Sequence, residues 1–180
     1  MKLSFQGITK TPISGRTSMN VQVTLVDGAN KGVSKTGTFT VNDNGIWSGK
    51  VSFDNVKPGG GYKFLVKGPK HIQKQICDSK PTEVSPGTYR CGSGNITVNV
   101  GNNTADFSGI KLLVGDLSPQ NGVVDSYDIA LIRNNFCNKL NPRTCRDPDI
   151  LTKADLNRDG VIDTQDYSLL ISSLSIKTDE

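Results

Sequence analysis

The stretch from Asp155 to Asp166 constrains the structure of this chain more than any other. Its twelve residues, DLNRDGVIDTQD, place oxygen-bearing side chains at positions 1, 3, 5, 9 and 12 and a glycine at position 6. This spacing lets one loop wrap a hard divalent cation, and the glycine permits the sharp turn that the wrapping needs. An acidic surface loop without an ion is the alternative. The pattern predicts a Ca²⁺ site with these ligands: Asp155, Asn157, Asp159, the carbonyl of Val161, Asp163 and Asp166.

A second copy of the pattern lies earlier in the chain. The run from Gly115 to Asp128 matches residues 154–166 when both are aligned backward from position 12, but it is one residue longer. Because it has one carboxylate fewer, it is expected to bind Ca²⁺ more weakly. Two bound ions are therefore expected. The predicted ligands of this first loop are Asp116, Ser118, Asn121, the carbonyl of Val123, Asp125 and Asp128. A backbone carbonyl could take the place of Ser118.

Helices are predicted around both loops. Apolar residues recur at helical spacing after Asp128 and again after Asp166, which favours two amphipathic helices that pack against each other. Asp147 followed by Pro148 predicts the start of a short helix that enters the second loop, since Asp caps helices and proline fits their first turn. No helix is expected before the first loop, where residues 110–114 are typical of a strand.

Residues 1–114, which we call the N-terminal part, have the alternation of short β-strands. Val21 to Val26 alternates with period two, and Asn44-Gly45 between two apolar runs predicts a hairpin. Seven or more such runs separated by turn residues favour two packed antiparallel sheets, an all-β sandwich. The expected core anchors are Trp47, Phe53, Tyr62, Phe64 and Phe107. An exposed Trp47 would instead offer a platform for a sugar ring.

The net charge of +4 conceals a split between the two ends of the chain. The N-terminal part has 14 Lys and Arg against 6 Asp and Glu, a charge of +8. Residues 115–180, the C-terminal part, have 7 against 11, a charge of −4 that two Ca²⁺ ions would cancel. The densest basic run is either a contact for acidic glycans or a solvated edge that discourages strand pairing; it contains Lys67, Lys70, His71, Lys74 and Lys80.

Four cysteines form two pairs that are close in the sequence, Cys77 with Cys91 and Cys137 with Cys145. This spacing predicts two local disulfides. Disulfides persist in an oxidising environment, so an extracellular or cell-surface location is expected. Reduced or metal-binding thiols are the alternative. Zinc is disfavoured because no C-x₂-C spacing occurs and His71 is the only histidine.

Several classes of function are disfavoured by composition. The chain has one histidine and two glutamates, and most of its aspartates are assigned to ions, so no catalytic group stands out. No apolar run approaches the length that crosses a bilayer, and no apolar signal region follows Met1. Neither membrane insertion nor nucleic-acid binding is expected. The sequence favours a non-catalytic protein.

Two resemblances to known families extend these predictions. The run Asp43 to Gly49, followed by Pro58-Gly59-Gly60-Gly61-Tyr62, resembles transthyretin-like and carboxypeptidase-regulatory-like sandwiches. Those domains have an immunoglobulin-like build and serve as stalks, spacers or binding modules on secreted proteins. The resemblance implies such a sandwich over residues 1–114.

Residues 115–176, with two EF-hand-like loop–helix repeats and Asp at position 12, resemble a dockerin. Dockerins are Ca²⁺-dependent modules that bind cohesin domains on a scaffold or cell surface. A small α-helical module over residues 115–180 is therefore expected to dock on a cohesin-like partner or to pack on its own sandwich. The partner-contact residues that the resemblance implies are Ser126, Tyr127, Arg133, Asn134, Thr164 and Gln165.

Two other functions stay open at this point. The chain could be a structural subunit of a surface fibre or adhesin, which would self-associate. It could also be a carbohydrate-binding accessory module of a polysaccharide-degrading system, which would bind glycans.

Overall fold

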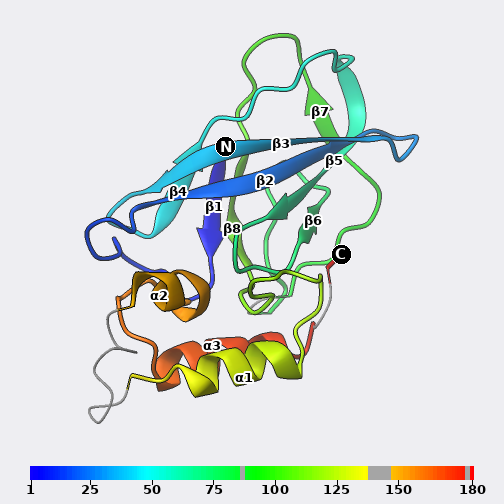
Figure 1. The fold of residues 1–180 in the computed structure, drawn as a ribbon. Coiled ribbons are helices and arrows are strands. Elements are labelled where there is room, and N and C mark those ends of the chain that lie inside the picture. Colours follow the sequence, from blue (N-terminus) through cyan, green and yellow to red (C-terminus); the bar gives the residue numbers. More distant parts are fainter. Residues whose placement is uncertain (86–87, 138–146, 177–178) are drawn as a thin grey trace.

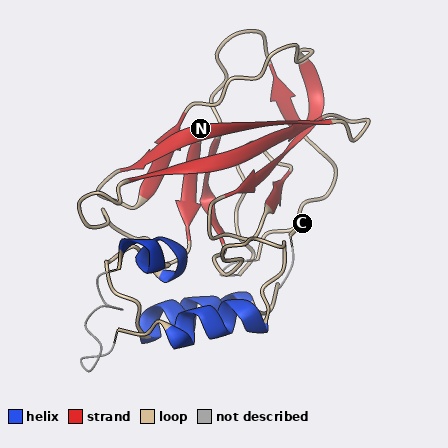
Figure 2. Cartoon of the chain, in the orientation of Figure 1, coloured by secondary structure: helices blue, strands red, loops and turns tan. Residues whose placement is uncertain are grey.

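The computed structural model describes residues 1–85, 88–137, 147–176 and 179–180. Figures 1 and 2 show the strands gathered in one half of the molecule and the helices in the other. No helix in the described residues is long and apolar enough to cross a bilayer. The strands are β1 (Lys2–Phe5), β2 (Ser18–Val26), β3 (Gly32–Val41), β4 (Ile46–Gly49), β5 (Gly59–Lys67), β6 (Lys74–Ile76), β7 (Ile96–Val98) and β8 (Asp106–Leu112), and the helices are α1 (Ser126–Asn134), α2 (Pro148–Ala154) and α3 (Thr164–Ser173).

The strands form one continuous curled sheet instead of the two separate antiparallel sheets expected from the sequence. Its order is β6-β5-β2-β3-β4-β1-β8, and β7 pairs with β5 outside this path. Strand β1 lies between β4, with which it pairs antiparallel, and β8, with which it pairs parallel at one end of the order. A shift of register between Leu3 and Ser4 lets this short strand change its alignment along β8. The immunoglobulin-like sandwich is therefore not confirmed.

The hairpin predicted at Asn44-Gly45 is confirmed and connects β3 to β4. The side-chain oxygen of Asn42 accepts hydrogen bonds from the N–H groups of Asn44 (3.0 Å) and Ile46 (2.9 Å). Gly45 has a φ of +74°, the conformation that glycine adopts without steric cost. Gly59 to Gly61 are the first residues of β5, which pairs with β7 through Gly59 and Tyr62.

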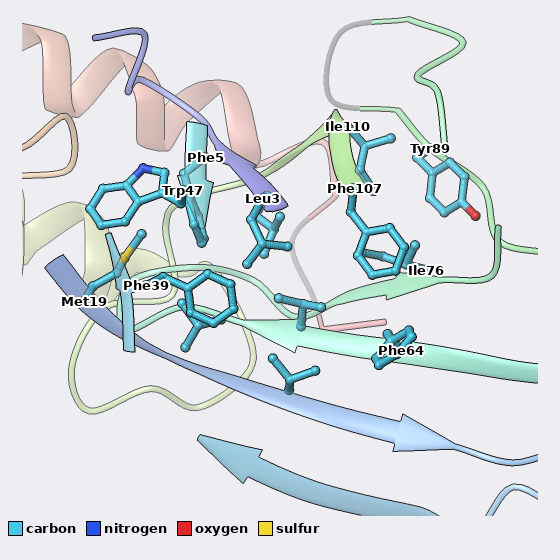
Figure 3. Close-up of a cluster of buried hydrophobic side chains, with 14 of the residues drawn as sticks. Leu3, Phe5, Met19, Phe39, Trp47, Phe64, Ile76, Tyr89, Phe107 and Ile110 are labelled. Atoms are coloured by element: carbon cyan, nitrogen blue, oxygen red, sulfur yellow. The ribbon is translucent and has the colours of Figure 1, made fainter. Parts of the chain in front are cut away.

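The main hydrophobic core lies inside the curled sheet (Figure 3). Trp47 is fully buried there, and its ring meets that of Phe5 edge-on with centroids 5.8 Å apart. The expected burial of Phe64 and Phe107 is confirmed, whereas Phe53 and Tyr62 are only partly buried at the edge of this cluster. The buried Trp47 ring leaves no platform for a sugar.

A second apolar cluster joins the sheet to the helices. From the N-terminal part it takes Ile72, Leu113 and Val114, and from the C-terminal part residues of all three helices and both loops. These include Leu117, Val124, Ile132, Leu151, Leu156, Ile162 and Leu170. Because this cluster crosses residue 114, the helices rest on the end of the sheet (Figure 1). A domain boundary at residues 114 and 115 stays a prediction.

One of the two predicted disulfides is present in the described residues. Cys77 and Cys91 are bonded, with Cα atoms 5.2 Å apart, next to the short strand β6. Cys145 lies outside the described residues, so its pairing with Cys137 stays a prediction.

The burial of Trp47 leads to a prediction for stability. Trp47→Ala should lower the free energy of unfolding by about 3–5 kcal/mol, because it removes a large ring from a packed core and leaves a cavity. Urea unfolding followed by circular dichroism measures this. Val100→Ala is the matched control, since Val100 is 85% exposed and should change the value by less than about 0.5 kcal/mol. Equal effects of the two substitutions would contradict the core assignment.

Candidate metal centre

The second loop, residues 155–166, lies between two helices whose caps set its ends. Asp147 caps α2 through its side chain, Pro148 occupies the first turn as predicted, and Asp155 is the C-cap. Asp163 is the N-cap of α3 and accepts a hydrogen bond from the N–H of Gln165 (2.7 Å). Gly160 has a φ of +93°, which allows the turn at position 6. The loop therefore starts at the end of one helix and finishes inside the first turn of the next.

The first loop, residues 116–128, has the same exit but no entering helix, as expected. Strand β8 ends at Leu112, and the chain reaches Asp116 four residues later. Asp125 caps α1, and Gly122 has a φ of +83°. Both exit helices begin at loop position 10, earlier than the sequence pattern suggested. The reason is the capping box, in which the aspartates at positions 9 and 12 bind each other's backbone across the first turn.

The aspartates at position 12 close both loops by the same contacts. Asp166 accepts hydrogen bonds from the N–H groups of Leu156 (2.7 Å) and Asp163 (2.9 Å). Asp128 accepts them from the N–H groups of Leu117 and Asp125, both at 2.8 Å. Both carboxylates are buried. The two loops are therefore built alike, although one is longer.

The aspartates at position 1, Asp116 and Asp155, are both fully buried. One oxygen of each accepts a hydrogen bond from the glycine at position 6: Asp155 Oδ2 from Gly160 (2.9 Å) and Asp116 Oδ2 from Gly122 (3.1 Å). The other oxygen differs between the loops. Asp155 Oδ1 is buried and has no hydrogen-bond partner in the described residues, whereas Asp116 Oδ1 accepts from the N–H of Asn121 (2.9 Å).

The unpartnered Asp155 oxygen shows that the second loop fits a hard cation. A buried carboxylate oxygen without a donor is costly, and an ion bound by the loop would satisfy it. Asp116 has no such oxygen, which agrees with a weaker first site. When Ca²⁺ is bound, it supplies positive charge to the loop carboxylates, and the residues that would hold it in the second loop are those predicted from the spacing.

The other predicted ligands lie in the same two loops but do not converge by themselves. Asn157, Asp159, Asn121 and Asp125 make short-range hydrogen bonds within their own loops. Val123 and Val161 turn their side chains outward, each 37% exposed, and Ser118 is exposed. Within the described residues, no group of three or more acidic, histidine or cysteine side chains is close enough to hold a metal. The physical reason is that the carboxylates at positions 9 and 12 face backbone N–H groups.

Cations from the N-terminal part contact the position-1 aspartates, and the sequence reasoning missed them. Arg16 pairs with Asp155 Oδ2, and Lys70 Nζ donates to the backbone carbonyl of Asp155. Lys67 Nζ lies 2.7 Å from Asp116 Oδ2 and 2.5 Å from Asp179 Oδ2. The signal that could have found them was the charge split between the two parts.

Most of the basic run is not a solvated edge, although Lys80 at its end is exposed. Lys70, His71 and Lys74 are 6%, 2% and 4% exposed. Lys74 Nζ pairs with Glu180 Oε1 at 2.6 Å, and Gln73 donates its backbone N–H to Asp179 Oδ1 at 2.7 Å. These lysines are buried because the acidic C-terminal part covers them.

Arg158, at position 4 of the second loop, binds that loop to the sheet. Its guanidinium donates to the carbonyl of Ser18 (2.9 Å) and lies over the Trp47 ring, 5.2 Å from the centroid. A cation over an indole face is stabilised by the quadrupole of the ring. Arg158 has a φ of +63°. Its side chain extends from the loop toward the sheet.

Burial dominates the electrostatics of both loops. It raises the pKa of Asp155 and of Asp128, and it raises the pKa of Asp166 to about 6, against the hydrogen bonds from Asp163, Leu156 and Asn157. Burial also lowers the pKa of Lys70 to about 8. For Lys67, burial is outweighed by the hydrogen bonds that its ammonium donates to Asp116 and Asp179 and by the charges of those carboxylates, so its pKa is raised. Without a bound ion, the charged forms of Asp155 and Asp166 in the second loop are therefore disfavoured.

The residues implied as partner contacts lie on two different surfaces. Ser126, Tyr127, Arg133 and Asn134 are all exposed on α1. Thr164 and Gln165 are exposed at the start of α3, where they line a groove with Gly7 and Leu169 among others.

The far end of α3 is held by the sheet. Gln6, which directly follows β1, donates to Ser172 Oγ (2.7 Å) and accepts from Ser173 Oγ (2.9 Å). Figure 1 shows α1 and α3 side by side, with α3 nearer the sheet. The face of α1 is therefore the more open of the two surfaces.

The unpartnered oxygen predicts which site is stronger. Asp155→Ala should abolish the tighter of two Ca²⁺ binding events and leave the weaker one, because it removes the only position-1 oxygen that is free for an ion. Isothermal titration calorimetry on chelator-treated protein measures both events. Asp54→Ala, at an exposed aspartate in the loop between β4 and β5, is the control. Two intact events in Asp155→Ala would reject the loop assignment.

The raised pKa of Asp166 predicts a proton release linked to Ca²⁺. The ion-free carboxyl is half protonated near pH 6, whereas bound Ca²⁺ requires the charged form. Affinity should therefore fall as the pH drops through 6, and binding at pH 6 should release protons that binding at pH 8 does not. Calorimetry in buffers of different ionisation enthalpy measures this release. Asp166→Asn should abolish it, and equal release at both pH values would contradict the prediction.

One of three comparisons with known proteins gave a match, and it covers the part of the chain that contains both loops. Comparison with curated proteins and with solved structures gave no match. A scan against family models matched residues 115–175, about a third of the chain, which we call the dockerin segment. Dockerin domains bind calcium and mediate calcium-dependent docking between proteins. The segment that contains both loops and all three helices is thus similar to the dockerin type I domain.

Proposed function

We propose that the dockerin segment binds a cohesin-like domain in the presence of Ca²⁺ and that the exposed face of α1 carries the contact. The observation that supports this is the two-sided environment of α1. Its inner residue Ile132 is fully buried in the cluster shared with the sheet, while four positions on the outer side are exposed. A partner would therefore bind a helix whose opposite side already packs against the rest of the fold.

The outer side of α1 has the chemistry of a binding surface. Tyr127 is 56% exposed and lies in the first turn, and Arg133 lies in the last turn of the same helix. Tyrosine and arginine are enriched among residues that dominate binding energy, because each combines a large contact area with directional hydrogen bonds. Ser126 and Asn134 add small polar groups at the two ends. This set suits a polar, specific interface.

Ca²⁺ would act on this surface through the first turn of α1. Asp125 and Asp128 are predicted ligands of the first loop and also form the capping box that starts the helix. An ion that binds them would set the position of Ser126 and Tyr127, which lie between them in the sequence. Ion binding and partner binding are therefore coupled through the same turn.

The N-terminal part would then serve as a rigid platform for the docking helix. Packing of the C-terminal part on its own sheet, the alternative expected from the sequence, is compatible with docking because the two use opposite sides of the helices. A glycan-binding role has less support, since Trp47 is buried. The Cys77–Cys91 disulfide favours an extracellular or cell-surface setting.

A pull-down against a panel of cohesin domains tests the docking. The chain should bind at least one of them in Ca²⁺, and chelator should abolish the binding. Tyr127→Ala and Arg133→Ala should each weaken it about tenfold or more, because each removes an exposed side chain of a type that dominates binding energy.

The control is Arg90→Ala, at an exposed arginine of the N-terminal part. It should leave cohesin binding unchanged. No binding to any cohesin, or full binding by Tyr127→Ala and Arg133→Ala together, would reject the α1 surface.

A further inference from the structure

Two segments of the N-terminal part, far apart in the sequence, deliver a cation to equivalent atoms of the two loops. Arg16 lies between β1 and β2 and pairs with Asp155 Oδ2. Lys67, the last residue of β5, lies 2.7 Å from Asp116 Oδ2. Asp155 and Asp116 are the position-1 aspartates of their repeats, and in both the contacted oxygen is the one that accepts from the loop glycine.

These contacts are shielded from water. Both aspartates are fully buried, and the Arg16 and Lys67 side chains are only 18% and 14% exposed. A buried carboxylate without a counter-charge strongly destabilises a fold. Without Ca²⁺, the sheet therefore supplies the charge that each loop needs.

We propose that Arg16 and Lys67 are built-in counter-ions for the two loops, which keep the C-terminal part seated on the sheet without Ca²⁺ and weaken the binding of the ion. This inference depends on the assignment of the loops as Ca²⁺ sites but not on cohesin docking. It assigns to two residues of the N-terminal part a role in setting the Ca²⁺ affinity of the C-terminal part.

Two effects of Arg16 on Ca²⁺ affinity oppose each other. Its guanidinium holds the Asp155 carboxylate in place, which would favour the ion, and its charge repels the ion, which would disfavour it. The repulsion is the larger effect, because the N–H of Gly160 holds the same oxygen at 2.9 Å and keeps the carboxylate oriented when Arg16 is removed. The N–H of Gly122 does the same for Asp116 when Lys67 is removed.

The two loops should respond independently. Arg16 contacts only the second loop's aspartate, and Lys67 contacts the first loop's aspartate and Asp179. Each substitution should therefore change one binding event and leave the other, a pattern that a general loss of positive charge cannot produce.

The test is calorimetry with Ca²⁺ on the full, chelator-treated chain. Arg16→Gln should tighten the event that Asp155→Ala abolishes by about tenfold, the scale of one close unit charge acting on a divalent ion under water-like screening. Lys67→Gln should tighten the other event by a similar factor. Lys35→Gln, which removes the same charge from an exposed ion pair with Asp54, should change neither. Arg16→Lys keeps the charge and should stay near the parent affinity.

Thermal unfolding supplies a readout that does not need the titration. In chelator, Arg16→Gln and Lys67→Gln should melt several degrees below the parent, and saturating Ca²⁺ should remove most of that difference. A variant that folds only with Ca²⁺ supports the proposal.

Unchanged or weaker Ca²⁺ binding in both variants overturns the proposal, as does an equal loss of melting temperature with and without the ion. A parent chain that binds no Ca²⁺ overturns it together with the loop assignment. Failure of cohesin binding alone leaves the counter-ion result intact, so the two proposals are tested separately.

Discussion

Ion pairs buried between the basic N-terminal part and the acidic C-terminal part are the interaction on which this arrangement depends. They join Arg16, Lys67 and Lys74 to Asp155, Asp116, Asp179 and Glu180. Such pairs add little net stability over apolar packing, but an unpaired member is strongly destabilising. In the observed placement of the helices on the end of the sheet, each of these charges has a partner. The cluster around Leu113 and Val114 supplies the apolar burial.

This placement separates the two sides of the C-terminal part. The inner side faces the sheet through Ile132 and the buried aspartates, and the outer side of α1 stays open. The two loops lie between these sides, so an ion bound there would be in reach of both. A charge that the N-terminal part brings to a loop would then affect the ion, and ordering of the first loop would affect the first turn of α1. A docking module of this build would be sensitive to the domain that carries it.

Local features were predictable from the sequence, whereas long-range pairings were not. The hairpin at Asn44-Gly45, the cap at Asp147 and the two loop–helix repeats depend on residues within a few positions of each other, and all are present. The two-sheet sandwich was not confirmed and the strand order could not be predicted, because β1 pairs with β8 about a hundred residues later and period-two alternation carries no information on the partner. The starts of α1 and α3 were placed three residues late, since the capping box was not recognised in the loop pattern.

The spacing of oxygen-bearing residues in the two loops predicted by itself the loop–helix repeats that the structure contains. Only the tertiary structure decided what surrounds those loops. Arg16 and Asp155 are 139 positions apart, and the lysines that a sequence pattern assigns to a solvated edge become buried when an acidic segment covers them. The physical reason is the distance along the chain over which each interaction acts. Ligand spacing and helix capping involve residues within one or two turns of each other, whereas the partner of a charge is set by the packing of the whole fold.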